Sequence, residues 1–166
     1  EYIASLRDGR TLHIDGKVVT DVTDYPPLRG IIDTIASLHD DQHDPALRDI
    51  LTYRSPSTGA LVSKTYLEAR TAEEFRALAA CFHLRAQRTF GLMGRLTDFM
   101  SGFLVDLSAG LRALGKTEAA ARAQGMVELC REGDLQVTHA LIDPQSDRST
   151  LDAPSQAVQL VPKAST

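Results

Sequence analysis

Two helix-length stretches joined by a very short connection constrain the fold of this chain more than any other feature. Apolar residues recur at helical spacing over residues 98–114 and again over 117–133, and Gly115 and Gly133 end the two stretches. So short a connection makes two helices antiparallel neighbours. Each would span roughly 25 Å at about 1.5 Å per residue. We therefore expect the residues that flank this helical hairpin to lie at the same end of it.

The apolar positions of the hairpin predict which side of each helix is apolar. In the first helix they are Met100, Phe103, Leu104, Leu107, Leu111 and Leu114. In the second helix, which starts at Thr117, the expected inner face consists of Ala119, Met126, Leu129 and Cys130. A repeat at this spacing places its members on one side of a helix.

The first third of the chain predicts two β-hairpins and a helix between them. Asp15-Gly16 lies between residues 11–14 and 17–20 and suits a type I′ turn, which needs a positive φ at both central residues. A second hairpin is expected around residues 55–59. Prolines 26 and 27 suit the first turn of a helix. The apolar residues of that helix at helical spacing are Leu28, Ile31, Ile32, Ile35 and Ala36.

Two further helices are predicted from their starts. Asp44 suits the cap of a short helix opened by Pro45. Thr71 and Glu74 form a capping box, in which each side chain accepts a hydrogen bond from the backbone of the other residue. The stripe of this second helix consists of Phe75, Leu78, Ala79, Phe82 and Ala86, and Gly91 is its expected stop.

These patterns together predict a mainly α chain with short β-hairpins. Its 166 residues fit one domain with a sizeable core. We expect residues 1–148 to form a helical domain. Residues 149–166 would form a linker and then a strand at 157–161, for which the rest of the sequence offers no obvious partner.

Composition argues against several classes of function. The net charge is −4 without a basic run, which argues against nucleic acid as a partner. No apolar run approaches the ~20 residues of a membrane span, so no membrane association is expected. Cys81 and Cys130 are isolated and form no metal-type cluster. We expect them to be buried thiols of a cytoplasmic protein.

A group of histidines and aspartates near position 40 imitates a metal site. Its members are His39, Asp40, Asp41, His43 and Asp44. We interpret this group as the acidic, solvated end of a helix, so that no metal ligands are predicted.

Two polar islands carry the residue types of a binding site. One is residues 91–99, which contain Arg95 between glycine and apolar neighbours. The other is residues 138–148, where a histidine, an amide, a carboxylate and a guanidinium surround Pro144. A segment broken by proline forms little regular structure and can present polar groups to a ligand. Because the islands flank the helical hairpin, we expect Arg95 and His139 to lie close together.

The motifs in these islands resemble those of a known enzyme family. The specific ones are Gly91-Leu92-Met93-Gly94-Arg95, and Thr138-His139-Ala140 followed by Pro144-Gln145. Weaker matches extend along nearly the whole chain, among them Leu6-Arg7-Asp8, Asp21-Val22-Thr23 and Leu51-Thr52-Tyr53. The chain resembles the N-terminal region of the 4-hydroxyphenylacetate 3-hydroxylase oxygenase family, which are two-component, reduced-flavin-dependent phenol monooxygenases.

The resemblance implies a fold, cofactors and partners. The fold would be the N-terminal helical domain of an acyl-CoA dehydrogenase-like architecture, here truncated, so that we expect the 166-residue chain alone to be inactive. Residues 149–166 would then begin a missing middle β domain. The full-length form would be a cytoplasmic homotetramer that takes reduced FAD from a separate flavin reductase. With O2 as co-substrate, it would hydroxylate a phenolic small molecule.

The resemblance also implies roles for individual residues. Arg95 and His139 would be catalytic, and together with Phe99 they would bind substrate. The flavin would be bound by His139, Ala140, Leu141, Gln145, Ser146, Asp147 and Arg148. Physically, Arg95 can stabilise a phenolate through charge-assisted hydrogen bonds, and His139 can donate to the same oxygen or relay its proton. Gln145 can both donate and accept, and Arg148 can pair with phosphate.

The sequence departs from the family pattern in two places. Phe99 stands where some members have tyrosine, and Leu96-Thr97 replaces the Ser-Pro or Thr-Pro that often follows the arginine. These departures leave open which phenol is the substrate. The related 4-hydroxybutyryl-CoA dehydratases carry iron–sulfur cysteines near the arginine motif, and this chain has none there.

Simpler interpretations of the same residues remain open. His139 can be a partly buried histidine with satisfied hydrogen bonds, and Arg95 can cap a carbonyl or pair with Asp98. Asp147 and Arg148 can pair with each other at the surface, which contributes little. Met93 and Phe99 can be packing residues. The alternative function is a non-catalytic helical interaction module or remnant derived from the family.

Overall fold

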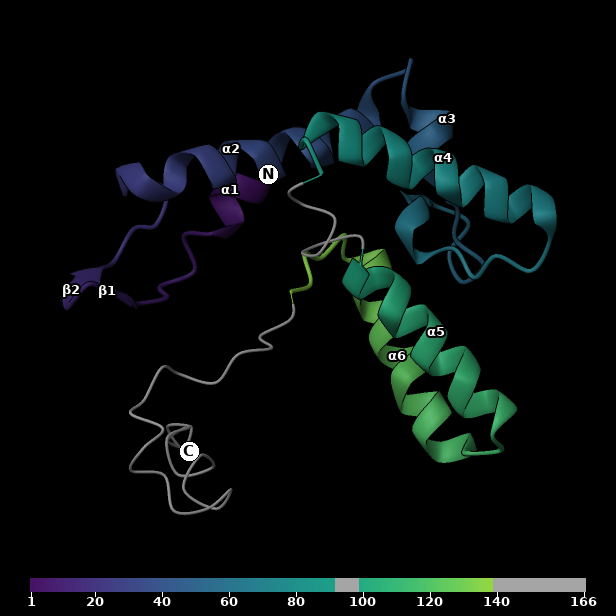
Figure 1. Ribbon diagram of the computed structural model, residues 1–166. Coiled ribbons are helices and arrows are strands. Elements are labelled where there is room, and N and C mark those ends of the chain that lie inside the picture. Colours follow the sequence, from purple (N-terminus) through teal and green to yellow (C-terminus); the bar gives the residue numbers. More distant parts are fainter. Residues whose placement is uncertain (92–98, 139–166) are drawn as a thin grey trace, which may run out of the picture.

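Long helices and two short β-hairpins make up residues 1–91 and 99–138, the part of the chain that the computed structural model describes. The elements in order are α1 (Tyr2–Ser5), β1 (Leu12–Ile14), β2 (Lys17–Val19), α2 (Pro26–Asp40), η1 (Asp41–His43), α3 (Arg48–Leu51), β3 (Thr52–Arg54), β4 (Leu61–Ser63), η2 (Lys64–Tyr66), α4 (Ala72–Arg88), α5 (Phe99–Ala113) and α6 (Thr117–Glu132). The α5 and α6 helices run side by side below α2 and α4 (Figure 1). This arrangement confirms the predicted mainly α fold with short hairpins. None of the described helices is both long and apolar enough to cross a membrane.

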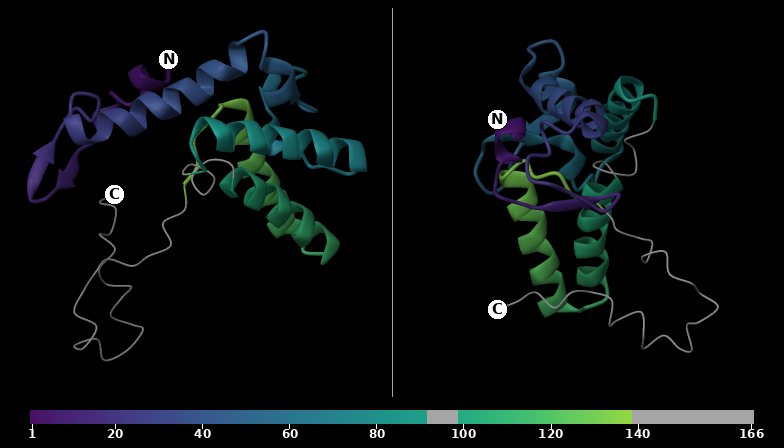
Figure 2. Two further views of the ribbon diagram at one scale, coloured as in Figure 1. Left: turned by 45° about the horizontal axis from the view of Figure 1, so that its top comes forward. Right: turned by 90° about the vertical axis from the view of Figure 1, so that its left-hand side faces the viewer.

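The first hairpin extends beyond the start of α2 (Figure 2), and side chains of the two elements share a core cluster. Its strands are antiparallel, with Leu12 opposite Val19. Asp15 and Gly16 have φ values of 50° and 73°, which confirms the predicted turn. A small core cluster of Val19, Val22 and Ile32 joins the hairpin to α2. Partly buried side chains complete this cluster: Tyr2, Leu6, Ile14, Tyr25 and Leu28.

The short helix predicted after Asp44 begins later than expected. The Asp44 carboxylate accepts a hydrogen bond from the Ala46 backbone N–H at 2.8 Å, and α3 begins only at Arg48. Asp44 therefore closes a turn that precedes the helix instead of capping it. The second predicted hairpin is confirmed as β3 and β4, with Thr52 opposite Ser63.

The buried face of α5 matches the prediction only in part: Met100 is buried and Leu104 packs on the main core cluster. Ser101 and Ser108 are each 1% exposed, and Val105 between them is 6% exposed. Large apolar residues of the predicted stripe are exposed instead: Phe103, Leu107 and Leu114. Small side chains let the helices approach closely, and the Ser108 hydroxyl donates a hydrogen bond to Gln124 of α6 at 3.1 Å. Helical spacing predicts the helix, but it does not distinguish a seam of small residues from an apolar stripe beside it.

The buried face of α6 is also rotated from the prediction. Val127 and Cys130 lie in the main core cluster together with Tyr66 and Val105. Of the predicted inner face, Cys130 is buried, but Met126 and Leu129 are 48% and 60% exposed. Tyr66 comes from the distant η2 and fills the space between the two helices. The periodicity of α6 carries no information about this partner.

The buried face of α4 contains Cys81 and Arg85 instead of the predicted apolar stripe. Phe75, the first member of that stripe, is 66% exposed. The helix packs on α3 and η2, where Arg85 enters a polar region. Both cysteines, Cys81 and Cys130, are free and buried, as predicted.

The predicted capping box at the start of α4 is confirmed. The Thr71 hydroxyl accepts from the Glu74 backbone N–H at 3.1 Å, and the Glu74 carboxylate accepts from the Thr71 N–H at 2.9 Å. The α6 helix also starts with a threonine, Thr117, but its N-cap makes no side-chain hydrogen bond.

Replacing Thr71 with alanine should therefore destabilise the fold through α4. We expect Thr71→Ala to lower the free energy of unfolding by about 1 kcal/mol, the usual effect of losing a cap. The matched control Thr117→Ala should change it by less than about 0.5 kcal/mol. Urea unfolding followed by circular dichroism measures both. Equal effects of the two substitutions would show that the capping box contributes nothing specific.

Candidate functional site

Most of the predicted site residues lie outside the described ranges. These are Arg95 and the flavin-binding set His139, Ala140, Leu141, Gln145, Ser146, Asp147 and Arg148. The strand predicted at residues 157–161 also lies outside them. Phe99 is described: it is the first residue of α5, is 52% exposed, and stacks on Phe103 with ring centroids 6.4 Å apart.

The described flanks of both polar islands lie at one end of the helical hairpin. The start of α5 and the end of α6 are adjacent (Figure 1). Val137, which follows α6, packs on the core cluster that contains Val105 of α5 and Tyr66. The predicted convergence therefore holds for the described flanks. That Arg95 and His139 themselves meet stays a prediction.

The α6 helix ends with an aspartate where glycine is usual. The Leu135 N–H donates to the Cys130 carbonyl at 2.9 Å, and Asp134 between them has φ 45°. This is a Schellman ending, in which the left-handed position is most often glycine. At the corresponding end of α5 that position is Gly115, with φ 68°. A left-handed conformation is uncommon for a residue with a side chain, so the Asp134 side chain needs a reason.

The α4 helix, which leads toward Arg95, ends in a comparable way. The Gly91 N–H donates to the Ala86 carbonyl at 2.8 Å, and Phe90 has φ 52°. A bulky residue in this conformation costs of order 1–3 kcal/mol, and such strain clusters at functional sites. Phe90 is 92% exposed, so no contact within the described residues explains it. Both helices that lead into the predicted site thus end on a strained residue.

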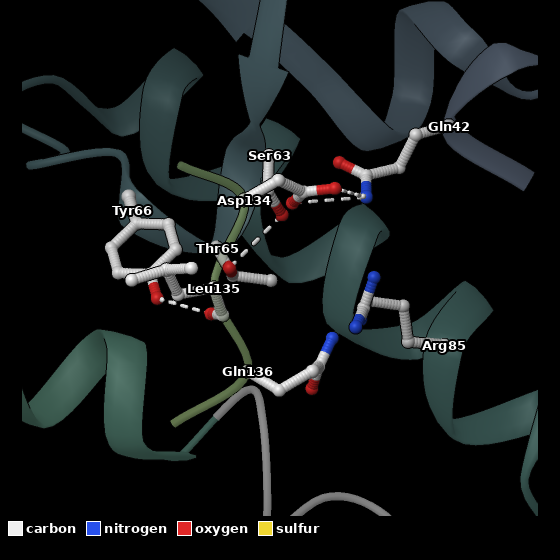
Figure 3. Close-up of a pocket in the computed structure, with 8 residues that line it drawn as sticks. All are labelled: Gln42, Ser63, Thr65, Tyr66, Arg85, Asp134, Leu135 and Gln136. Carbon is white, nitrogen blue, oxygen red and sulfur yellow. Dashed lines mark hydrogen bonds between the residues drawn. The ribbon is translucent and has the colours of Figure 1, made fainter. Parts of the chain in front are cut away.

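A polar junction explains the aspartate at the end of α6, and Figure 3 shows four of its members: Gln42, Arg85, Asp134 and Gln136. We define the polar junction as His39, Gln42, Arg85, Asp134 and Gln136. The His39 Nδ1–H donates to Asp134 at 2.7 Å, and the Gln42 amide donates to the same carboxylate at 3.2 Å. The other ring nitrogen, His39 Nε2, accepts from the Gln136 amide N–H at 2.7 Å. Side-chain hydrogen bonds therefore join the end of α2 and η1 to the segment that follows α6, and Arg85 of α4 lines the same pocket.

The electrostatics of the junction favour an ionised Asp134. Burial acts to raise the pKa of this carboxyl, but hydrogen bonds from His39 and Gln42 and the charge of Arg85 outweigh burial and lower the pKa. Next to it, the Tyr66 hydroxyl donates to the Leu135 carbonyl at 3.2 Å. Burial raises the pKa of Tyr66, so this hydroxyl stays a donor. Two successive residues after α6 are thus held by hydrogen bonds: Asp134 by His39 and Gln42, and Leu135 by Tyr66.

The cavity in the polar junction is too small for a substrate or a flavin. Its volume is about 10 Å³, roughly what one water molecule needs. The Gln136 Oε1 atom is buried and has no hydrogen-bond partner among the described residues. The junction itself therefore has no room for either ligand.

A second polar cluster fastens the last turn of α6 to the loop of the second hairpin. The Ser55 and Thr58 hydroxyls donate to the two Glu132 carboxylate oxygens at 2.6 and 2.7 Å. Arg131, whose side chain is 3% exposed, donates to Glu132 and to the Ser57 hydroxyl at 2.7 and 2.8 Å. The two hydroxyl bonds, and then Arg131, lower the pKa of Glu132 to about 2.

Sequence reasoning missed both supports. His39 was interpreted as part of a solvated helix end, but its side chain is 13% exposed. Asp41 is likewise not free in solvent, because it pairs with Arg88 at 2.8 Å. Among the described residues, no group of three or more potential metal ligands gathers. No sequence signal marked Asp134, because its left-handed conformation is visible only in the structure.

Comparison with known proteins identifies the family. The family described as 4-hydroxyphenylacetate 3-hydroxylase, N terminal, matches residues 1–164. The chain belongs to this family.

Among characterised members, the chain is 33% identical to the oxygenase component of 4-hydroxyphenylacetate 3-monooxygenase from Thermus thermophilus, over 90% of this chain and 30% of that protein. It is also 33% identical to a pyoverdin chromophore biosynthetic protein from Pseudomonas aeruginosa, over 90% of this chain and 29% of that protein. The chain thus spans about 30% of the length of the relatives it matches.

Solved structures of the family match the fold. A 4-hydroxyphenylacetate 3-monooxygenase oxygenase component complexed with FAD and 4-hydroxyphenylacetate has a TM-score of 0.77 and 32% identity, over 89% of this chain and 30% of that one. An archaeal 4-hydroxybutyryl-CoA dehydratase has a TM-score of 0.73 at 22% identity, which shows a shared fold alone. These neighbours confirm the predicted N-terminal helical domain of an acyl-CoA dehydrogenase-like architecture.

The low pKa of Glu132 makes its contribution to stability depend on pH. The folded-state pKa of about 2 lies below the ordinary value of 4.5. Ionised Glu132 therefore stabilises the fold at neutral pH, and this contribution is lost as the pH falls from 4.5 toward 2. We expect Glu132→Gln to lower the free energy of unfolding at pH 7. The difference in this free energy between the variant and wild type, the stability gap, should narrow below pH 4.5.

Urea unfolding at a series of pH values measures this gap. Glu118→Gln is the matched control, because the Glu118 side chain is 87% exposed and, among the described residues, pairs only with Arg122 one turn further along the surface of α6. It should change stability little at any pH. A gap for Glu132→Gln that stays constant down to pH 3 would contradict the assignment of the Ser55 and Thr58 bonds.

Proposed function

We propose that this chain is the N-terminal domain of the oxygenase component of a two-component aromatic hydroxylase. The observation that carries the proposal is its likeness to a solved oxygenase component that holds both FAD and 4-hydroxyphenylacetate. The geometry supports it, because both polar islands continue from the same end of the α5–α6 hairpin. In this proposal the enzyme works in the cytoplasm, and a separate flavin reductase supplies its reduced FAD.

The proposed substrate is a phenolic small molecule held by Arg95, Phe99 and His139. A phenolate attacks an electrophilic oxygen far better than a phenol does, so the site must favour loss of the phenolic proton. A guanidinium at Arg95 stabilises the phenolate by charge-assisted hydrogen bonds. His139 donates a hydrogen bond to the same oxygen or relays its proton. Phe99, stacked on Phe103, provides an apolar wall that excludes water.

The proposed flavin-binding stretch is residues 139–148, and the donors there fit the chemistry of FAD. Reduced FAD, when bound, would react with O2 and supply the oxygen atom for hydroxylation. Gln145 both donates and accepts, which suits the edge of the flavin ring. Arg148 pairs with a phosphate. The other proposed contacts are His139, Ala140, Leu141, Ser146 and Asp147.

The exposed apolar side chains of α5 and α6 support a place in a larger assembly. Phe99, Phe103 and Leu107 recur every four residues along α5 and are 52%, 48% and 39% exposed. Leu129 of α6 is 60% exposed. Exposed apolar patches mark interaction surfaces. In the proposal they are covered within a full-length homotetrameric oxygenase, three times as long as this chain if it follows its relatives.

The function is tested with the complete oxygenase chain that contains this sequence. Wild type should bind reduced FAD anaerobically and convert a phenol to a catechol when O2 is added. His139→Ala should still bind reduced FAD, but its hydroxylation rate should fall ~10²–10⁴-fold, as loss of a proton-transfer group predicts. The oxygen consumed should then appear as H2O2.

The exposed His83 of α4 provides the matched control for this substitution. His83→Ala should couple oxygen consumption to product as well as wild type does. Equal coupling in His139→Ala would remove His139 from the site. No binding of reduced FAD by the wild-type chain would contradict the proposed function and favour a non-catalytic helical module.

Arg95 should act as a charged anchor for the phenolic oxygen. Arg95→Lys keeps the charge but loses the planar guanidinium, so it should retain part of the phenol affinity. Arg95→Met should lose most of it, while both variants still bind reduced flavin. Phenol titration of the anaerobic complex with reduced FAD measures the affinity, with Arg76→Met on the exposed side of α4 as control. Wild-type phenol affinity in Arg95→Met would make Arg95 a scaffold residue.

A further inference from the structure

His39 lies where the chain leaves α6 and heads for residues 139–148. Its two ring nitrogens bind two residues of this exit, Asp134 and Gln136, each at 2.7 Å. Leu135, which lies between these two residues, accepts a hydrogen bond at its carbonyl from the Tyr66 hydroxyl. Val137, the next residue after Gln136, packs on the main core cluster. The exit is thus held at every residue from 134 to 137, and Gln136 is only three residues before His139.

The orientation of the His39 ring is itself fixed from a third direction. Tyr2 of α1 stacks on it, with ring centroids 5.1 Å apart and planes at 25°. The side chain is 13% exposed. A ring held by its face and by both nitrogens has one orientation, so it can hold the exit in one position.

The hydrogen bonds also fix the tautomer of His39. A carboxylate only accepts, so Nδ1 carries the proton that points at Asp134. The Gln136 amide nitrogen only donates, so Nε2 is the acceptor. An imidazole held in one tautomer by a carboxylate is a common way to orient a neighbouring functional group.

The choice of aspartate at position 134 has no other explanation among the described contacts. A glycine would adopt φ 45° more readily and would end α6 equally well. Only a side chain can reach His39 and Gln42, however. The left-handed Asp134 is accepted because its carboxylate anchors the exit.

We propose that His39 is a positioning residue that fixes Asp134 and Gln136, and that flavin binding depends on this fixed exit because the proposed flavin-binding stretch begins three residues after Gln136. This inference rests on the proposed function, because it takes residues 139–148 as the flavin-binding stretch. His39 touches neither flavin nor substrate in this role. It acts only through the exit from α6.

Two substitutions remove this clamp without opening a large cavity. His39→Phe keeps an aromatic ring to stack on Tyr2 but loses both hydrogen bonds. Asp134→Gly keeps the helix ending, relieves the left-handed backbone and removes the carboxylate. His39→Asn keeps a hydrogen-bond donor near the position of Nδ1, so it should retain part of the wild-type hold on Asp134. His43→Phe in η1 is the matched control, because His43 is exposed and no described hydrogen bond involves its side chain.

The experiment measures hydrogen exchange and flavin affinity in the complete oxygenase chain. In His39→Phe and Asp134→Gly, amides of residues 135–142 should exchange at least tenfold faster, while those of α5 and α6 keep their wild-type rates. The dissociation constant for reduced FAD should rise on the order of tenfold, as loss of two hydrogen bonds predicts. The exchange rates and the dissociation constant of His39→Asn should lie between those of these variants and those of wild type. His43→Phe should have the wild-type values of both.

The outcomes separate this inference from the proposed function. Wild-type exchange and wild-type flavin affinity in both clamp variants would overturn the inference and leave the proposed function intact. Faster exchange with unchanged flavin affinity would also overturn it, since His39 would then only anchor the chain. If wild type failed to bind reduced FAD, the proposed function would fail and the role of His39 toward the flavin would fail with it. If His39→Phe does not fold, Asp134→Gly decides by the same criteria.

Discussion

The hydrogen bond from His39 to Asp134 joins two helix ends that are 95 residues apart in the sequence. It connects the end of α2 to the end of α6, and Arg85 brings α4 to the same place. The small core cluster under the first hairpin and the main cluster between α5 and α6 contain no residue in common. The polar junction therefore fixes how the α2 layer and the helical hairpin are oriented, because apolar packing alone is less directional than a hydrogen bond.

Polar contacts of this kind specify geometry more than they add stability. A carboxylate that is partly withdrawn from water needs hydrogen-bond donors, and the half-exposed Asp134 receives donors from both His39 and Gln42. The network tolerates few alternative arrangements for the same reason. Glu132, with its hydroxyl donors from the second hairpin, holds the preceding turn of α6 in the same manner. Two polar clusters on consecutive turns thus hold the point at which the chain enters the proposed flavin-binding stretch.

Local sequence signals predicted the elements of the fold well. The Asp15-Gly16 turn and the Thr71 capping box are formed by residues close together in the sequence. Whether they form therefore depends little on the rest of the chain. Burial was predicted less well. The buried face of α6 is the one that packs on Tyr66 of η2. In α5, Ser101 and Ser108 are buried, while larger apolar residues such as Phe103 are exposed. Such choices depend on partners far away in the sequence, which periodicity does not contain.

The candidate site could be predicted from motifs, but its support could not. Gly91-Leu92-Met93-Gly94-Arg95 and Thr138-His139-Ala140 point to the family, and the match over residues 1–164 confirms the family. The pairing of His39 with residues 134 and 136 follows from no local pattern, because it requires the relative placement of α2 and α6. The left-handed conformation of Asp134, which suggests that its side chain has a partner, is likewise visible only in the structure.

The most direct test of the account is a crystal structure of the complete oxygenase chain with FAD and a phenol bound. The account predicts that Arg95 and His139 lie within hydrogen-bond distance of the phenolic oxygen, about 2.7–3.2 Å, and that residues 139–148 contact the flavin beside an intact His39–Asp134 bond. A structure in which residues 139–148 lie away from the flavin, or in which neither Arg95 nor His139 reaches the phenol, would contradict it.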